Sequence, residues 1–403
     1  EAEQEIMLKE AGYNSLEDLM KNTVPEKILL KDELKIDEPL SENDALKKLK
    51  TISKQNKIFR NFIGMGYYNS FTPNVILRNI LENPGWYTSY TPYQPEVAQG
   101  RLEMLLNFQQ LIIDLTGMDI ANASLLDEAT AAAEAVGLSQ RLDKNNSKKI
   151  FISSSCNPQT IDLIKTRTEP FGLELIIGNE KSDLQNISEN IVCGVLSYPG
   201  TLGDIQDPSE SISQIHKKNG KAILVCDLLA LTRLKTPAEL GADIAVGSAQ
   251  RFGIPMGYGG PHAAFFATKE EFKRSMPGRI IGVSVDRHGK KAYRLSLQTR
   301  EQHIRRDKAT SNICTAQALL AIISAAFAMY HGPKGLLKIA NRTSSLAKLF
   351  ADGIKKTGFK ILSDHFFDTV TIVTKNKTKE IYQKAQSEGI NLRKVDEDNL
   401  SVA

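Results

Sequence analysis

The stretch Ile244-Ala245-Val246-Gly247-Ser248-Ala249-Gln250-Arg251-Phe252-Gly253 decides the fold of this chain. It opens with a short apolar run, which predicts a buried strand over residues 244–247. A polar turn follows the strand, and a glycine-rich stretch at residues 257–262 comes next. In open α/β sheets, ligands bind at the carboxyl ends of the strands. The turn after residue 247 is therefore the first place to look for a functional site.

Similar apolar runs lie on both sides of this stretch. They predict further strands at residues 149–153, 174–177, 191–197, 222–227 and 263–267. Helical periodicity lies between several of them, at residues 160–169 and 210–218. Short apolar strands that alternate with helices are typical of a mostly parallel sheet covered on both faces. We therefore predict an α/β fold.

The pattern along the chain divides it into three expected parts. Residues 1–100 form a polar helical arm and a loop rich in Tyr, Pro and Gly, residues 101–330 form the large α/β domain, and residues 331–403 form a small α+β domain. In this last part a strand is expected at residues 369–373 and a helix at residues 378–388. The chain begins at Glu1 instead of Met, so we expect that its natural start is missing and that the last domain is truncated.

The composition excludes several classes of function. The chain has 403 residues, a net charge of +4 and 24% charged residues, which is ordinary for a globular protein and argues against a nucleic-acid surface. No apolar run approaches the roughly 20 residues that span a bilayer. The four cysteines show no CxxC spacing and the six histidines no helical pair, so we expect no metal site.

Carboxylates stand at two positions where an α/β protein binds ligands. Asp127 and Glu128 open the Ala-rich helix at residues 129–138, where they would satisfy the free backbone N–H groups and repel an anionic ligand. An ordinary acidic helix start explains them equally well. Asp227 ends the strand at residues 222–227, where it could face a ligand or cap the next helix.

The Tyr- and Pro-rich loop offers candidate cleft residues. Tyr93, Gln94 and Glu96 lie within it, and they could stack on, or orient, a small amine. A rigid packing loop at a subunit contact is the alternative, since Tyr is also favoured there. Thr310 precedes a long apolar helix expected over residues 314–330 and is a plausible N-cap. His262 is the one histidine in a suggestive context, beside the glycine-rich turn.

Five stretches together resemble one family, the glycine cleavage system P-protein, which is a glycine decarboxylase dependent on pyridoxal phosphate (PLP). They are residues 64–68 (GMGYY), 83–88 (NPGWYT), 90–96 (YTPYQPE), 121–130 (ANASLLDEAT) and 300–312 (REQHIRRDKATSN). The resemblance covers nearly the whole chain. It implies the fold of aspartate aminotransferase (fold type I of PLP enzymes) with a small C-terminal α+β domain.

The resemblance also shows where this chain departs from a working PLP enzyme. Such enzymes carry their cofactor-binding lysine in the turn after the strand, where this chain has Gln250 or Arg251. An arginine stays protonated and cannot form the imine. Asp227 then stands at a degenerate ring position, and Asp127 and Glu128 at a degenerate phosphate position. The chain is similar to the first, lysine-free half of the long P-protein.

From the family we expect the full enzyme to bind glycine on PLP held by the other half. It releases carbon dioxide and passes the aminomethyl group to the lipoyl arm of H-protein. This half would complete the active site, with Tyr93, Gln94 and Glu96 in the substrate cleft and Thr310 contacting the cofactor phosphate of the neighbouring site. A homodimer of the full enzyme is expected, cytoplasmic in a bacterium or mitochondrial in a eukaryote.

Two alternatives stay open. In the first, the chain is a scaffold or docking module for H-protein or the partner half and does not touch substrate. In the second, it is a PLP enzyme that uses another lysine, such as Lys235 or Lys308. Neither lysine lies in the turn after a strand that this chemistry requires.

Overall fold

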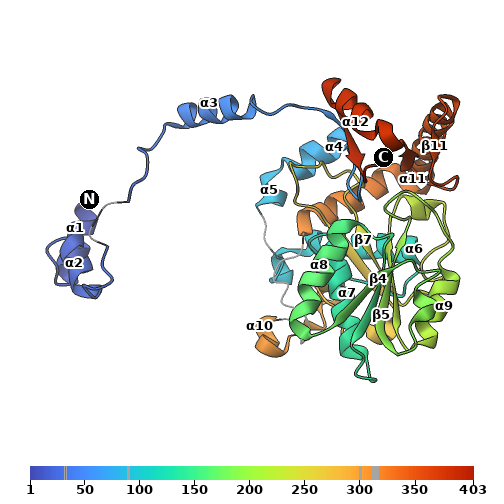
Figure 1. The fold of residues 1–403 in the computed structure, drawn as a ribbon. Helices are drawn as coiled ribbons and strands as arrows, with labels where there is room; N and C mark the ends of the chain where they lie inside the picture. The colour runs from blue at the N-terminus through green and yellow to red at the C-terminus, as the bar shows by residue number, and fades with distance from the viewer. Residues whose placement is uncertain (31, 33, 89–90, 299–301, 310–316) are drawn as a thin grey trace. The chain divides into compact units, whose positions relative to one another are not determined.

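The computed structural model describes residues 1–403 apart from 31, 33, 89–90, 299–301 and 310–316. The chain divides into two compact units, Glu1–Ile58 and Phe59–Ala403 (Figure 1). The three-part division at residues 100 and 330 stays a prediction. Within the described residues, no helix is both long and apolar enough to cross a membrane.

The first unit consists of helices joined by extended segments. They are α1 (Ala2–Glu10), α2 (Leu16–Thr23) and α3 (Glu42–Ser53). Ser15 and Ser41 cap α2 and α3, where each hydroxyl accepts a hydrogen bond from the backbone N–H three residues on. No residue of these three helices is buried, so the described residues of this unit form no core of their own.

The second unit contains the predicted parallel sheet. Its strand order is β2-β8-β7-β6-β5-β3-β4, and β8 runs antiparallel to its neighbours β7 and β2. The strands are β2 (Ile120–Ala121), β3 (Lys149–Ser153), β4 (Glu174–Gly178), β5 (Ile191–Tyr198), β6 (Lys221–Cys226), β7 (Ile244–Ser248) and β8 (Ala264–Thr268). The six predicted strands are confirmed to within one residue at each end. The α/β class is confirmed as well.

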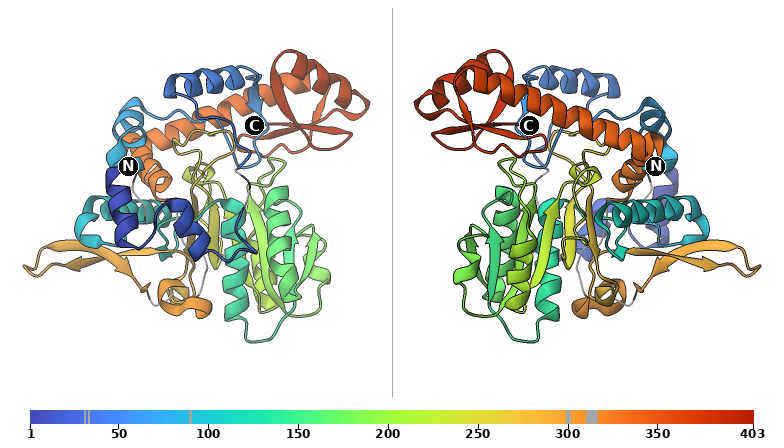
Figure 2. Two further views of the ribbon diagram at one scale, coloured as in Figure 1. Left: turned by 90° about the vertical axis from the view of Figure 1, so that its left-hand side faces the viewer. Right: turned by 90° about the vertical axis from the view of Figure 1, so that its right-hand side faces the viewer.

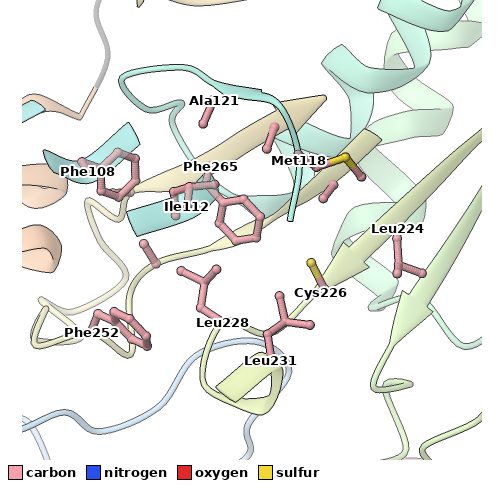
Figure 3. Packing of buried hydrophobic residues seen from close by; sticks show 14 of the residues in the cluster. Phe108, Ile112, Met118, Ala121, Leu224, Cys226, Leu228, Leu231, Phe252 and Phe265 are labelled. Atoms are coloured by element: carbon pink, nitrogen blue, oxygen red, sulfur yellow. The ribbon is translucent and has the colours of Figure 1, made fainter. Parts of the chain in front are cut away.

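The sheet separates two apolar cores. Ala222, Leu224 and Cys226 of β6 point into one core, and Ile223 and Val225 point into the other. Both faces of a central strand are thus buried, which explains why its sequence is continuously apolar. Figure 3 shows the first core from close by, with Leu224 and Cys226 of β6 among the labelled residues.

Helices cover both faces of the sheet. The first core is closed by α6 (Gln99–Thr116), α9 (Ser209–Lys217) and the first part of α11 (Ala318–Lys356), and the second by α7 (Glu128–Leu142) and α8 (Pro158–Thr168). The backbone of α11 is broken at Gly332, which has non-helical angles, and Pro333 follows it. The sequence predicts this break, since the apolar helix is expected to end near residue 330.

A second sheet forms the C-terminal part of this unit. Its order is β1 (Arg60–Phe62), β13 (Ile390–Lys394), β14 (Asn399–Val402), β12 (Val370–Val373) and β11 (Lys360–Ile361), and α12 (Thr378–Ser387) contacts it. The strand near residues 369–373 and the helix near 378–388 are confirmed. The N-terminal loop contributes one edge strand, because β1 pairs in parallel with β13.

The segment expected to be irregular contains several short helices. They are α4 (Asn74–Ile76), the π-helix η1 (Leu77–Leu81), α5 (Pro84–Tyr87) and the 3₁₀ turn η2 (Pro95–Val97). An antiparallel ribbon is among the elements that were not predicted from the sequence. Strands β9 (Ile280–Val285) and β10 (Lys291–Ser296) form an antiparallel ribbon that projects from the body (Figure 2).

Candidate functional site

Arg251 lies in the turn after β7 and joins the two sheets. Its guanidinium forms an ion pair with Asp227, which follows β6, and donates a hydrogen bond of 2.7 Å to Oδ2 of Asp368, which lies just before β12. Only 8% of the Arg251 side chain is exposed. The arginine thus replaces a ligand between the carboxyl ends of the large sheet and the small sheet.

Aromatic rings complete the surroundings of this guanidinium. Its central carbon lies 4.0 Å from the ring centroid of Tyr68 and 5.5 Å from that of Phe367, so cation–π attraction adds to the ion pairs. Burial alone would lower the pKa of Arg251, but the charges of Asp227 and Asp368 outweigh it and raise that pKa above its ordinary value. Arg251 is a permanent cation and has no nucleophilic nitrogen.

Gln250, the other candidate for the lysine position, has a structural role. Its side chain is fully buried, and its Oε1 accepts a hydrogen bond of 2.9 Å from the backbone N–H of Tyr68. Its Nε2 donates to the carbonyl oxygens of Tyr68 and Ile254, both at 2.7 Å. The amide therefore fastens the loop around residue 68 to the turn after β7. Both residues at the expected lysine position therefore have a structural role. Gln250 binds the backbone of Tyr68, and Arg251 pairs with Asp227 and Asp368.

Of the two roles that the sequence left open for Asp227, the structure shows the helix cap, and the other carboxylate oxygen pairs with Arg251 instead of facing a ligand. One carboxylate oxygen pairs with Arg251, and the other accepts hydrogen bonds from the backbone N–H groups of Leu229 (2.7 Å) and Ala230 (3.1 Å). The carboxylate thus caps the short helical turn that follows β6. A ring nitrogen would have to displace a guanidinium to reach it.

The start of α7 is satisfied by the chain itself. Asp127 is the N-cap and accepts a hydrogen bond of 2.7 Å from the backbone N–H of Thr130. Glu128 is buried, and its Oε1 accepts from Nδ2 of Asn157 (2.9 Å) and from Oγ1 of Thr160 (3.1 Å). Burial raises the pKa of Glu128, although these two hydrogen bonds oppose the shift. Two carboxylates therefore occupy the start of α7, and both would repel a phosphate group there.

The space between these groups is small. The cavity beside Arg251 has a volume of about 50 Å³ and is lined, among others, by Gly66, Tyr68, Glu128, Asp227 and Asp368. That volume admits one or two water molecules, whereas pockets for small organic ligands span roughly 300–1,000 Å³. A cation fills the lysine position and pairs with Asp227, the carboxylate that a ring nitrogen would need, and two further carboxylates fill the phosphate position. These residues therefore do not fit PLP.

The predicted cleft residues lie elsewhere. Tyr93, Gln94 and Glu96 are exposed, and none of them lines the Arg251 cavity. The hydroxyl of Tyr93 accepts a hydrogen bond of 2.7 Å from Nη2 of Arg279. Their part in a substrate cleft stays a proposal, and Thr310 lies outside the described residues.

The remaining side chains that the sequence singled out are not parts of this cavity. Lys235 and Lys308 are exposed and do not line it. His262 packs on Tyr67 with a distance of 4.7 Å between ring centroids, and burial lowers its pKa. Within the part of the chain that the structure describes, no group of three or more His, Cys, Asp or Glu side chains could hold a metal.

The sequence did not point to Asp368, the second carboxylate that pairs with Arg251. It lies between Phe367 and a strand of the small sheet, in a largely apolar stretch. A buried charge among apolar residues needs a partner, so its position in the stretch Phe366-Phe367-Asp368-Thr369-Val370 was a usable signal. The partner itself lies 117 residues away and could not be read from the pattern.

The fold and the site define a class of protein. The chain is an α/β protein with the fold type I architecture of PLP enzymes, and Arg251 occupies the expected lysine position. A solved structure of a C-DES mutant with glycine covalently linked to its PLP cofactor is 14% identical, with a TM-score of 0.60 over 88% of this chain and 94% of that one. At this identity the likeness concerns the fold alone.

The family model for the glycine cleavage system P-protein matches residues 1–403, and this chain belongs to that family. It is 73% identical, over 401 residues, to a glycine dehydrogenase (decarboxylating) of Pelagibacter ubique, covering 100% of this chain and 42% of that protein. A crystal structure of an inhibitor-bound glycine decarboxylase (P-protein) is 33% identical, with a TM-score of 0.91, 100% of this chain and 94% of that chain being covered. The chain spans about two fifths of the length of its curated relatives.

Proposed function

We propose that this chain is the lysine-free half of a glycine decarboxylase and that another polypeptide segment holds PLP. The observation that carries the proposal is the ion pairing of Arg251 with Asp227 and Asp368, which fills the lysine position with a buried cation. The chain belongs to the P-protein family, but Arg251 fills its lysine position. The imine-forming lysine for the family's reaction would therefore come from a polypeptide segment outside this chain.

The comparisons support the wider setting of this proposal. Two curated relatives, 73% and 56% identical, are named glycine dehydrogenase (decarboxylating), and more than half of their length lies outside the part that this chain matches. PLP on the other half would supply the electron sink for decarboxylation. H-protein, glycine and a second copy of the full enzyme are the proposed partners. The bacterial origin of these relatives favours the cytoplasm as the compartment.

The residues of this half would shape and support the shared site. Gln250 and Arg251 fix the loop around residue 68 against the turn after β7, so both present an ordered backbone to a partner. Tyr93, Gln94 and Glu96 would form one wall of the substrate cleft, and Thr310 would contact the cofactor phosphate. The exposure of the first three is compatible with a cleft that is closed by the other half.

A docking role without substrate contact is the second candidate. It is favoured by the small Arg251 cavity, which Tyr93 does not line. Turnover by a full-length Glu96→Gln variant separates the two candidates, since Glu96 carries no structural ion pair among the described contacts. Loss of turnover with intact assembly favours the cleft role.

The isolated chain is expected to be inactive. With PLP added, it should not exchange the carboxyl group of glycine with labelled bicarbonate, because it offers no amine in the turn after β7. The full-length protein in the same assay is the positive control. Exchange by the isolated chain above the protein-free blank would refute the proposed division of labour.

A further inference from the structure

Glu128 is a buried carboxyl group without a cationic partner. It is 7% exposed, and its Oε1 accepts hydrogen bonds from the neutral side chains of Asn157 and Thr160. Among the described residues, no Lys, Arg or His side chain forms an ion pair with it. We propose that Glu128 is a pH-sensitive switch, which holds the loop of residues 64–68 closed while its carboxyl group is neutral and loosens that loop when it ionises. This inference does not depend on the proposed function.

The charges around Glu128 are either negative or already paired. Asp127, the N-cap of α7, and Asp227, after β6, both disfavour a further negative charge here. Arg251 lines the same cavity, but its guanidinium is bound by Asp227 and Asp368. Burial, and after it nearby carboxylates that include Glu128, raise the pKa of three further groups, namely Tyr67, Cys156 and Cys226. Phenols and thiols supply no positive charge, so the carboxyl group has no cation of its own.

Burial of Glu128 outweighs the groups that favour its ionised form. The two neutral hydrogen-bond donors and the positive end of α7 stabilise a carboxylate, the helix end by about 0.3–2 kcal/mol. Removing an unpaired carboxylate from water costs several kcal/mol even after the protein relaxes. The pKa of Glu128 is accordingly raised, with burial as the largest cause and the charges of Asp227 and Asp127 as further ones. The folded protein therefore holds this proton at pH values at which the unfolded chain has released it.

The second carboxyl oxygen of Glu128 lies against the loop of residues 64–68. A Cβ atom added to Gly66, whose φ is +89°, would lie 3.4 Å from Oε2 of Glu128 and 3.3 Å from Nδ2 of Asn157. The backbone of the loop thus packs directly on the carboxyl group. The same loop is fixed to α8, because Nε2 of Gln159 donates a hydrogen bond of 2.8 Å to the carbonyl oxygen of Met65.

An ionised Glu128 needs more water than the closed loop admits. The cavity that Glu128 and Gly66 line has a volume of about 50 Å³, which holds one or two water molecules. A carboxylate offers about four acceptor sites, and the structure fills two of them with Asn157 and Thr160. Water reaches Oε2 more fully when Gly66 moves away from it. Ionisation of Glu128 therefore favours an open loop.

The raised pKa of Glu128 fixes the sign of the pH dependence. When the loop opens, water reaches the carboxyl group and its pKa falls towards the ordinary value. The closed loop therefore has its full stability below the pKa of the open state. It loses that stability as the pH rises through the pKa of the closed state. The loop should loosen on the alkaline side.

Hydrogen exchange at the backbone amide of Tyr68 in the full-length P-protein tests this inference. This N–H donates to Oε1 of Gln250, so it is protected while the loop is closed. After correction for the intrinsic pH dependence of exchange, its protection should fall at least about tenfold between about pH 5 and about pH 9, or about 1.4 kcal/mol. In Glu128→Gln, which stays neutral, it should change less than about twofold. Glu169→Gln, exposed on the turn η3 (Glu169–Phe171), is the matched control and should behave like the parent.

A second variant, Thr160→Val, distinguishes a switch from a purely structural contact. The hydroxyl of Thr160 favours the ionised form of Glu128, so its loss should move the loss of protection to higher pH. Protection that is independent of pH in the parent would overturn the inference, and so would the parent's pH dependence in Glu128→Gln. If Glu128→Gln does not fold, a transition in Thr160→Val at the pH of the parent, or below it, is sufficient to overturn it.

Discussion

Substitution of Arg251 with methionine is expected to lower the free energy of unfolding by about 3–5 kcal/mol, the usual cost of removing one partner from a buried ion pair. The loss leaves Asp227 and Asp368 close together without their cation, and the Asp368 side chain is only 8% exposed. The midpoint of urea unfolding, followed by circular dichroism, measures the effect. The same substitution at Arg274, which is exposed, is the matched control and should change stability by less than about 0.5 kcal/mol.

A compensating variant separates the charge from the packing of Arg251. Adding Asp227→Asn and Asp368→Asn to Arg251→Met removes both orphaned charges, so part of the lost stability should return. A loss of stability below about 1 kcal/mol for the single variant falls within the range of solvent-exposed ion pairs. It would mean that water reaches the two carboxylates. The view of this site as a closed ionic contact between the two sheets would then be wrong.

Replacing Gln250 with methionine is expected to cost at least about 3 kcal/mol, since each buried polar group left without a partner costs roughly 1–3 kcal/mol. Three backbone groups lose their partner, namely the N–H and C=O of Tyr68 and the C=O of Ile254. Met matches the volume of Gln, so packing changes little. Urea unfolding again gives the measurement.

Gln110→Met is the matched control for this variant. Gln110 is exposed on α6 and donates only to the side chain of Asp114, one turn further along the helix. Its loss should leave stability within about 0.5 kcal/mol of the parent. If Gln250→Met behaves like the control, the loop around residue 68 is not fastened through this amide.

The parallel sheet could be predicted because its strands are buried on both faces. Residues 191–197 and 244–247 read as continuous apolar runs for this reason. Apart from β12, which the sequence predicts at residues 369–373, the small sheet offers no such signal. Strand β13 carries Asn391 and Arg393 and is half-buried, so its pattern resembles a loop. Its partner β1 lies more than 300 residues away in the sequence, and no local pattern encodes that pairing.

The candidate site shows the same division between local and distant information. The sequence placed Asp227 and Arg251 at the carboxyl ends of two predicted strands, which is where an open α/β sheet binds ligands. It could not supply Asp368, which reaches the site from the small sheet. Nor could it predict the role of Gln250, whose partner Tyr68 is 182 residues distant. These contacts depend on how the two sheets meet, which periodicity does not report.

Reductive trapping of the cofactor tests the central claim most directly. The full-length P-protein that contains this sequence is incubated with PLP, reduced with borohydride and digested, and the pyridoxyl-labelled peptide is identified by mass spectrometry. Our account predicts that the specific label lies on a lysine outside residues 1–403, because a paired guanidinium occupies the lysine position within them. A stoichiometric label on any lysine within residues 1–403 would contradict it.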